Sequence, residues 1–377
     1  MAKRAKIKKK AVGRGGSGHD GGAAPAKAKR QSKAVKRPQQ PGRLTRTKMQ
    51  GKPLNRSLHA AKATKQDEFY TQLSDIEKEL RHYTKHFKNK TVLCNCDDPT
   101  VSKFFHYFSH NFEKLKLKRL VTTCYKNCDA DLFSKHTAKK GICLEYDGDK
   151  NDNRVPDPAE IGIHQLKGDG DFRSEECVQL LKQANIVVTN PPFSLFREYV
   201  EQLVKYKKKF LIIGNINAIS YKECFELIRT DNMWLGYNCA RHFERPDGSI
   251  FESARSFWYT NLDTAKRHEE LILFRTYDAA DCPVYDNYEA IEVSKAVDIP
   301  TDYDGVMGVP ITFLDKYNPE QFEILGITDR GNAWGLKTRE YTNDDVPNPG
   351  DLNRRAVIKI GRTYKPTYAR LLIRRKQ

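Results

Sequence analysis

The residues with the clearest chemical meaning form the tetrad Asn190-Pro191-Pro192-Phe193. An exocyclic amine on a nucleobase is a poor nucleophile, because its nitrogen lone pair is delocalised into the ring. Two acceptors that hold both amine protons favour a pyramidal nitrogen whose lone pair points at an electrophile. The Asn190 side-chain oxygen and the Pro191 carbonyl can be these acceptors, while Pro192 fixes the turn and Phe193 stacks on the base. The plainer interpretation is a rigid turn between a strand and a helix.

A second polar segment, Gly168-Asp169-Gly170-Asp171-Phe172, precedes the helix that leads to the strand before this tetrad. Here Asp171 can accept a hydrogen bond from an adenine amine while Phe172 packs on the ring. Taken alone, the segment is equally well an acidic glycine turn. In the same way, the segment 67–71 alone is no more than the cap of the first helix.

Motifs for several other chemistries are absent from the sequence. It has neither H-E-x-x-H nor G-x-x-x-x-G-K-[ST], the common zinc-protease and P-loop motifs. Cys94 and Cys96 lie at a strand end, and Cys124 and Cys128 have no matching second pair, so we expect no metal. The absence of a Pro-Cys dipeptide argues against cytosine-C5 methylation through a cysteine adduct.

The elements that must position these residues follow from the apolar pattern. Apolar runs without polar alternation predict strands at 91–94, 120–124, 186–189 and 210–213, and three- and four-residue spacings predict helices over 72–87, 104–112, 174–184 and 195–203. Such strands, separated by amphipathic helices, indicate a parallel sheet covered on both faces. Ligands bind outside the carboxyl ends of such strands. The acidic segment 97–99 and the Asn190 turn both fall at such ends.

Beyond about residue 230 the pattern becomes β-rich and irregular. Strands are expected at 257–259, 271–274, 356–360 and 371–373. Asn318, followed by Pro319 and with Gln321 in the capping-box position, predicts the start of a helix. Residues 126–168 are too polar and turn-rich to assign.

The positive charge of the chain is concentrated at one end. Residues 1–66 hold 20 Lys and Arg and a single acid, Asp20, so their net charge is +19, whereas the other 46 basic and 47 acidic residues leave −1 for 67–377. The composition of 1–66 predicts a disordered, solvated tail. Such an arm can bind polyanions through counterion release, and it can equally be a solubilising or targeting extension.

Length and composition also favour a cytoplasmic protein. No run of eighteen apolar residues is present, so no membrane span is expected, and the basic N-terminus has no apolar core of a secretory signal behind it. Nine cysteines, an odd number without an export signal, argue for a reducing compartment.

Five segments together resemble the EcoRI-type adenine-specific DNA methyltransferases. They are 67–71, Cys94-Asn95-Cys96-Asp97-Asp98-Pro99, 168–174, 190–199 and 305–314. The resemblance runs from about residue 65 to 328. The chain differs from the family pattern in lacking the glycine-rich turn common in methyltransferases after the first strand, in residues 239–255, and in its longer basic tail.

The resemblance implies a Rossmann-like fold that uses S-adenosylmethionine, without a metal, to methylate adenine N6 in duplex DNA by base flipping. It implies that the tetrad Asn190-Pro191-Pro192-Phe193 holds the target base. It also implies a set of cofactor-binding residues: Phe69, Tyr70 and Thr71 at the methionine end, Asn95, Asp97 and Asp98 at the methionine or ribose part, and Asp171 with Phe172 at the adenine.

The sequence therefore predicts an α/β protein with three parts: a disordered basic tail over 1–66, a catalytic core that binds S-adenosylmethionine over 67–230, and the end of the core with a mainly β, irregular target-recognition region over 231–377. Expected partners are double-stranded DNA and a cognate restriction endonuclease, with a monomeric enzyme in a bacterial or phage-infected cell. The alternative activity is N-methylation of RNA or of a protein glutamine amide, because both also present a planar NH₂ group. A DNA-binding protein without catalysis would leave the tetrad unexplained.

Overall fold

The structure, a computed structural model, describes residues 70–96, 102–124, 141–153, 156–245, 248–329 and 334–376. The predicted tail over 1–66 lies outside these residues, as do Phe69, Asp97 and Asp98.

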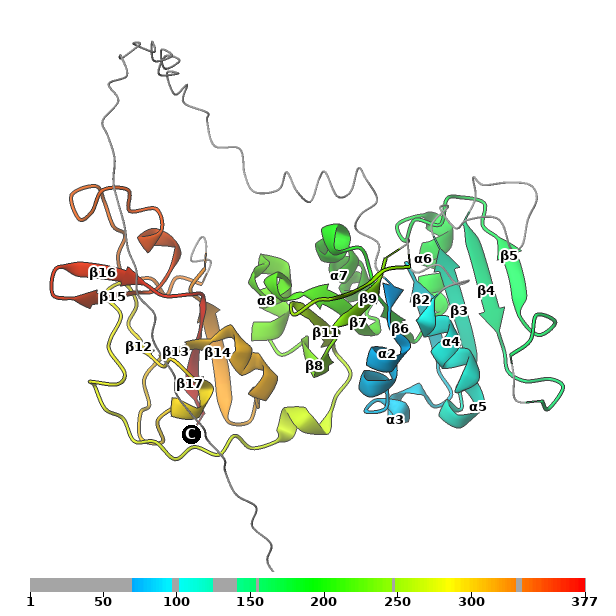
Figure 1. The fold of residues 1–377 in the computed structure, drawn as a ribbon, viewed down its shortest axis with the longest axis horizontal. Coiled ribbons are helices and arrows are strands. Elements are labelled where there is room, and N and C mark those ends of the chain that lie inside the picture. Colours follow the sequence, from blue (N-terminus) through cyan, green and yellow to red (C-terminus); the bar gives the residue numbers. More distant parts are fainter. Residues whose placement is uncertain are drawn as a thin grey trace, which may run out of the picture. The chain divides into compact units, whose positions relative to one another are not determined.

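The largest sheet has eight strands in the order β5-β4-β3-β2-β6-β7-β11-β8 (Figure 1). The central strands β3, β2, β6 and β7 run parallel to one another, whereas β4 and β11 pair antiparallel to their neighbours on both sides. The strands are β2 (Thr91–Asn95), β3 (Arg119–Cys124), β4 (Ile142–Tyr146), β5 (Gly162–Gln165), β6 (Ile186–Thr189), β7 (Lys209–Asn215), β8 (Trp234–Cys239) and β11 (Ser256–Thr260). The four predicted strands of the parallel sheet are thus confirmed, while β4 and β5 occupy part of the segment that the pattern left unassigned.

Successive residues of the central strands are buried on opposite faces of this sheet. On β2, Leu93 packs in one apolar cluster and its neighbours Val92 and Cys94 in the other, and on β6 Val187 is likewise separated from Val188. Burial on both sides explains why these strands lack polar alternation. The predicted two-sided cover of the sheet is therefore confirmed.

The helices divide between the two faces. The face of Leu93 is covered by α6 (Glu175–Gln183), α7 (Phe196–Lys205) and α8 (Lys222–Arg229), and the face of Val92 by α2 (Leu73–Leu80), α3 (Thr84–Phe87), α4 (Lys103–His110) and α5 (Phe112–Leu115). The helix predicted over 72–87 is two helices, because the chain turns at 81–83. There the amides of His82 and Tyr83 bond to the carbonyls three residues earlier, which tightens and ends α2.

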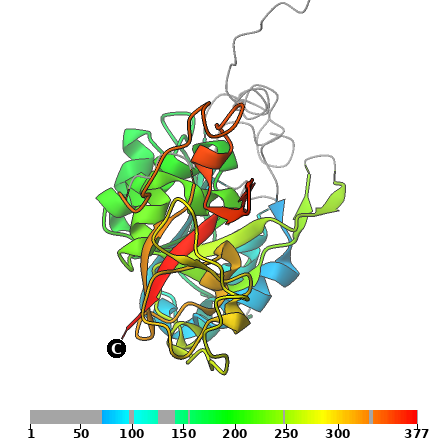
Figure 2. The same cartoon turned by 90° about the vertical axis from the view of Figure 1, so that its left-hand side faces the viewer.

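Two smaller sheets and a hairpin complete the described chain. A three-stranded sheet joins β1 (Tyr70–Thr71), β9 (His242–Glu244) and β10 (Ile250–Glu252), and the β9–β10 hairpin extends at the right-hand side of Figure 2. The C-terminal region has the order β12-β13-β17-β14, formed by β12 (Ile291–Glu292), β13 (Met307–Pro310), β14 (Phe322–Ile327) and β17 (Arg370–Arg375), and the hairpin of β15 (Val357–Ile360) and β16 (Thr363–Pro366). Short 3₁₀ turns connect the elements: η1 (Phe193–Leu195), η2 (Ile216–Ser220), η3 (Ala265–His268), η4 (Ala296–Asp298), η5 (Ile311–Lys316) and η6 (Leu352–Arg354).

Two predictions for the C-terminal half are wrong. Residues 271–274 form no strand, and Ile272 and Phe274 are 79% and 68% exposed. No helix begins at Asn318, because its side-chain oxygen accepts a hydrogen bond from the amide of Glu320 at 2.7 Å in a local turn and the chain then enters β14. The capping residue therefore stabilises a turn before a strand.

Candidate active site

The order of the large sheet reverses between β2 and β6. From β2 the chain first adds β3 on one side, and it later adds β6 and β7 on the other. The crevice at such a reversal, outside the carboxyl ends of the two strands, is the usual ligand site of a doubly wound sheet. Here those ends are Asn95 and Thr189.

Hydrogen bonds join the two strand ends. The Thr189 hydroxyl donates to the backbone carbonyl of Asn95, and the Tyr199 hydroxyl on α7 donates to the side-chain oxygen of Asn95. Asn95 is 3% exposed and Tyr199 is fully buried. Burial raises the pKa of Tyr199 well above its usual value, so its phenol remains a donor. Asn95 is therefore held in place at the reversal of strand order.

The tetrad begins directly at this point. Asn190, buried and 7% exposed, follows the last residue of β6, while Pro192 and Phe193 are half-buried. The carbonyl of Pro192 accepts the amide of Leu195 at 2.9 Å and starts the η1 turn that leads into α7. The predicted order of strand, turn and helix is confirmed, and Asn190 and Pro191 lie at the carboxyl edge of the sheet.

One glycine lets α7 approach the sheet behind this loop. A Cβ on Gly214 of β7 would lie 2.5 Å from the Phe196 ring, closer than any real contact. Because the ring at the start of α7 occupies that space, the helix holds the end of the tetrad against β7.

The Asp171 segment contacts the same helix. The Phe172 ring is 5% exposed and meets the Tyr199 ring edge-on, with centroids 5.0 Å apart. Both carboxylate oxygens of Asp171 bond to the guanidinium of Arg173, at 2.9 and 2.6 Å, and Arg173 also reaches Glu198 of α7 at 2.8 Å. These bonds raise the pKa of Arg173. A ligand amine at Asp171 would share its carboxylate with Arg173.

The structure thus brings Asn95, the tetrad and Phe172 together around Tyr199. Tyr70 and Thr71 lie in a different sheet, where they pair with Glu244 and Phe243 of β9. Thr71 is 1% exposed, and among the described residues its Oγ1 has no hydrogen-bond partner. A buried hydroxyl in this state is ready to bond to a ligand.

A large cavity, which the sequence analysis missed, borders the same edge of the sheet. Its volume is about 840 Å³, and it extends from η2, directly after β7, to η4 and η5 of the C-terminal region. Its basic lining residues are Lys78, Arg241, His242, Lys295 and Lys316, and its acidic ones are Asp75 and Asp315. These basic residues come from four separate segments, so no run in the sequence indicated them.

Two carboxylates of α2 fix one wall of this cavity. Asp75 accepts the amides of Arg241 and His242, both at 2.7 Å. Glu79, fully buried, accepts the amides of Tyr237 and Asn238, also at 2.7 Å. Burial raises the pKa of Glu79 although these bonds oppose it. The chain from β8 to β9 is therefore fastened to the helix that follows β1.

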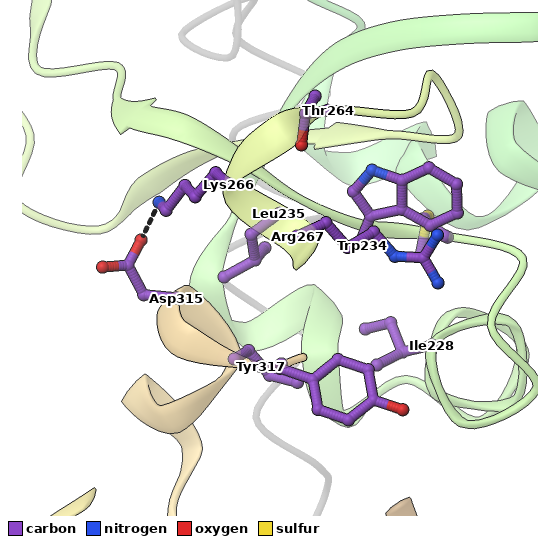
Figure 3. Close-up of a pocket in the computed structure, with 10 residues that line it drawn as sticks. Ile228, Trp234, Leu235, Thr264, Lys266, Arg267, Asp315 and Tyr317 are labelled. Atoms are coloured by element: carbon purple, nitrogen blue, oxygen red, sulfur yellow. Dashed lines mark hydrogen bonds and ion pairs between the residues drawn. The ribbon is translucent and has the colours of Figure 1, made fainter. Parts of the chain in front are cut away.

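A second cavity is too small for an organic ligand. It measures about 20 Å³, room for roughly one water molecule. Figure 3 shows Arg267 beside the Trp234 ring, with its guanidinium carbon 3.9 Å from the ring centroid, and the ion pair between Lys266 and Asp315. Both contacts start from η3, where Arg267 packs on β8 and Lys266 pairs with η5, so the cavity is a packing feature.

Within the described ranges, no three His, Cys, Asp or Glu side chains are grouped so as to hold a metal ion. In the same ranges, no helix has the length and apolar character needed to cross a membrane.

Comparison with known proteins agrees with this geometry. Residues 57–376 match the family described as adenine-specific methyltransferase EcoRI. The chain is 50% identical over 291 residues to the Type II methyltransferase M.EcoRI of Escherichia coli, a match that covers 72% of this chain and 89% of the relative. It is 35% identical over 344 residues to the Type II methyltransferase M.MgeORF184P of Mycoplasma genitalium, with 85% and 99% covered.

A third relative, the Type II methyltransferase M.MpnI of Mycoplasma pneumoniae, is 34% identical over 330 residues, which cover 80% of this chain and 97% of the relative. No solved structure gives a significant match. The family match spans most of the chain, including the crevice between β2 and β6, the tetrad after β6 and the C-terminal sheet. The chain belongs to the EcoRI family of adenine-specific methyltransferases.

Proposed function

We propose that this protein transfers a methyl group from S-adenosylmethionine to N6 of adenine in duplex DNA, with the target base flipped out of the helix. The observation that carries the proposal is the tetrad Asn190–Phe193 at the carboxyl end of β6, beside the reversal of strand order. The large sheet then is a Rossmann-like methyltransferase core.

The residues present fit the cofactor. The crevice beside Asn95 is where a doubly wound sheet binds nucleotides, Phe172 offers an aromatic edge at its border, and the buried Thr71 Oγ1 lacks a bond among the described residues. Asn95 and Phe172 would hold the nucleoside part, and Tyr70 and Thr71 the methionine end. Asp171, beside Phe172, would hold the adenine amine, and Phe69, Asp97 and Asp98 complete the proposed set. When bound, the cofactor supplies an electrophilic methyl group.

The tetrad performs the positioning. The side-chain oxygen of Asn190 and the carbonyl of Pro191 each accept one N–H of the adenine amine. With both protons held, the nitrogen lone pair points away from the two acceptors and toward the methyl group. The half-buried Phe193 stacks on the base, a contact worth about 1–3 kcal/mol. As the N–C bond forms, the methyl–sulfur bond would break and leave S-adenosylhomocysteine. The methylated amine then loses one proton to solvent, so no strong base is required.

The large basic cavity supports DNA as the substrate. It borders the same sheet edge as the tetrad, because it is lined by Ile216 and Ile219 just after β7. Its cations can contact the phosphates on either side of a flipped nucleotide. We therefore place the duplex at the cavity, between the large sheet and the C-terminal region.

The proposal is tested by incubating the protein with methyl-labelled S-adenosylmethionine and, in parallel, duplex DNA, RNA and a mixture of proteins. We expect label in duplex DNA, recovered as N6-methyladenine after digestion. Label only in RNA or in protein glutamine would contradict the proposal and favour the alternative, since that amide is also a planar NH₂. Sequencing of the methylated DNA would then give the recognition site.

The proposal also covers the oligomeric state, the cellular location and the partner of the enzyme. We propose a monomer in the cytoplasm of a bacterial or phage-infected cell, acting beside a cognate restriction endonuclease. The support is the family of the chain and its Type II relatives. A restriction assay on DNA methylated by this protein tests the pairing.

A further inference from the structure

The β15–β16 hairpin carries cations that have no carboxylate partner among the described residues. From residue 352 to the C-terminus the chain has no acidic residue. Carboxylates of other segments pair with three arginines outside the hairpin: Glu292 with Arg370, Glu323 with Arg374, and Asp329 with Arg355. Arg375 instead donates to the backbone carbonyl of Thr301.

Three exposed cations lie on this hairpin: Lys359, Arg362 and Lys365. Over the described ranges, none of them is within ion-pair distance of a carboxylate. The nearest aromatic partner of Lys359 is Tyr364, with its Nζ 5.3 Å from the ring centroid. Their charge is therefore available to an anionic partner.

The cations face both sides of the ribbon. Lys359 lies opposite Tyr364, and the next pair along the ribbon is Ile358 opposite Lys365. Residues of one pair project from the same face and successive pairs alternate, so Lys359 and Lys365 project from opposite faces. Arg362 occupies the two-residue turn with Gly361, whose φ of 59° suits glycine. The ribbon thus carries positive charge on each face and at its end.

The base of the hairpin is rigid. Val357 is fully buried, and its amide donates to the side-chain oxygen of Asn287 at 2.9 Å while its carbonyl accepts the amide of Asp286 at 2.8 Å. The Tyr364 ring also meets Tyr341 at 5.2 Å. In Figure 1 the hairpin lies at the left-hand margin, away from the large sheet. It is a fixed arm with an exposed end.

Apolar groups accompany the charge. Ile360, next to the turn, is 64% exposed, and Tyr368, just after β16, is 86% exposed. A surface that combines free cations with exposed apolar and aromatic side chains suits DNA, where phosphates border a groove floored by base edges and thymine methyl groups. The major groove of B-DNA is wide enough for a two-stranded ribbon, whereas that of A-form RNA is too deep and narrow.

We propose that the β15–β16 hairpin enters the major groove of duplex DNA, where Lys359, Arg362 and Lys365 contact phosphates of both walls and Ile360 meets the base edges. The proposal rests on the proposed function, since it assigns a contact to the same DNA substrate. A ribbon with cations on both faces matches a groove with phosphates on both sides.

The test compares the triple variant Lys359→Ala, Arg362→Ala, Lys365→Ala with the wild type in DNA binding at several salt concentrations. Each lost phosphate contact lowers the slope of log K against log salt by about 0.9, so we expect a slope smaller by about 2–3 and roughly 100-fold weaker binding near 0.1 M salt. The KM for DNA should rise, and the single variant Arg362→Ala should lower the slope by about one.

A matched control removes three exposed lysines at the other edge of the large sheet. Lys85, Lys88 and Lys114 lie on or beside α3 and α5, which precede the amino ends of β2 and β3. The variant Lys85→Ala, Lys88→Ala, Lys114→Ala has the same change in net charge and should bind DNA with the wild-type slope.

A separate chemical-protection experiment tests whether the hairpin binds in the major groove. Guanine N7 faces the major groove, so the wild type should protect flanking guanines from dimethyl sulfate and the hairpin variant should not. Equal slopes and equal protection for wild type and hairpin variant would overturn the proposal, as would an equal loss in the control. A wild type that methylates no DNA would instead overturn the proposed function, so the two failures are distinguishable.

Discussion

The large sheet and the C-terminal sheet share an apolar cluster, but the C-terminal sheet also contains a buried ion pair between two of its strands. In the large sheet, fully buried strand residues such as Val187 and Leu211 pack into one of two extensive apolar clusters. In the C-terminal sheet, the buried Glu292 binds Arg370 through three hydrogen bonds of 2.7–3.1 Å and also accepts the Tyr285 hydroxyl. Apolar packing, which both sheets use, tolerates many apolar sequences, whereas the ion pair depends on two individual polar partners that are far apart in the chain.

The largest effect is therefore expected at the buried pair. Glu292→Ala leaves the Arg370 guanidinium, 12% exposed, without its carboxylate, and breaking such a pair costs about 3–5 kcal/mol. The free energy of unfolding, measured with urea, checks this value. The matched control Glu323→Ala removes the half-exposed partner of Arg374 on the neighbouring strand, where we expect about 0–1 kcal/mol. Equal losses in the two variants would contradict the distinction between the sheets.

The second prediction concerns a substitution beside the large sheet that should lower the rate of methyl transfer without lowering the stability of the fold. Asn190→Ala should lower the rate of methyl transfer about 10²–10³-fold, because it removes one positioned acceptor. Single-turnover kinetics measure this rate. Binding of S-adenosylmethionine should stay within a few-fold, since Asn190 acts on the target amine. Near-normal turnover would mean that the tetrad is only a structural turn.

The third prediction extends the comparison to the tail. The net charge of +19 over 1–66 contrasts with −1 in the rest of the chain. Deletion of the tail should weaken DNA binding and reduce its salt slope, while the methylated sequence stays the same because phosphate contacts carry no sequence information. Binding titrations at several salt concentrations, together with sequencing of methylated DNA, check both points. An unchanged slope would favour a solubilising or targeting role.

The smallest effect is expected at His268, whose side chain connects the large sheet to the C-terminal sheet through two hydrogen bonds. His268 bonds to Asp263, just after β11, and to Glu320, just before β14, each at 2.8 Å. The bonds to Asp263 and Glu320 raise the pKa of His268. Burial alone would raise the pKa of the Asp263 and Glu320 carboxyl groups, but their hydrogen bonds to His268 lower it, and the net shift of both is downward.

Because the pKa of His268 is raised on folding, its contribution to stability is complete below its ordinary pKa of 6.5 and is lost as the pH rises through the folded-state pKa. Because the pKa values of Asp263 and Glu320 are lowered, their contributions to stability are complete above 3.8 and 4.5, respectively, and are lost as the pH falls through the folded-state values. His268→Gln should therefore lower the thermal midpoint most between about pH 4.5 and 6.5, by a small amount because the side chains are exposed. A pH-independent difference in midpoint would contradict this assignment.

The parallel strands of the large sheet could be predicted because the signal for each strand lies within a few consecutive residues. Four short apolar runs without alternation, with amphipathic helices between them, permit little except buried parallel strands, and Asn190–Phe193 lies directly after one of them. The outer strands β4 and β5 were missed, since β4 has only Ile142-Cys143-Leu144 as an apolar run and pairs antiparallel with both of its neighbours.

The same locality explains the failures. Asp75 and Glu79 have the spacing of an exposed helix face, yet they are buried because they bind backbone amides about 160 residues away. The apolar run at Ile272 and Phe274 suggested a strand, but the structure gives it no neighbouring strand and leaves both side chains exposed. The basic cavity depends on the same long-range assembly.

The fastening of α2 has a thermodynamic consequence for the order in which ligands bind. Thr71 and α2 are consecutive in the chain, and Asp75 and Glu79 fix the cavity wall that contains Arg241 and His242. Any ligand that favours one placement of β1 thereby favours one placement of this wall. If ligands bind at Thr71 and in the cavity as proposed, linkage requires that any effect of one on the affinity of the other is reciprocal and of the same factor. Two buried carboxylates on one helix would thus make the two binding events cooperative without any direct contact between the ligands.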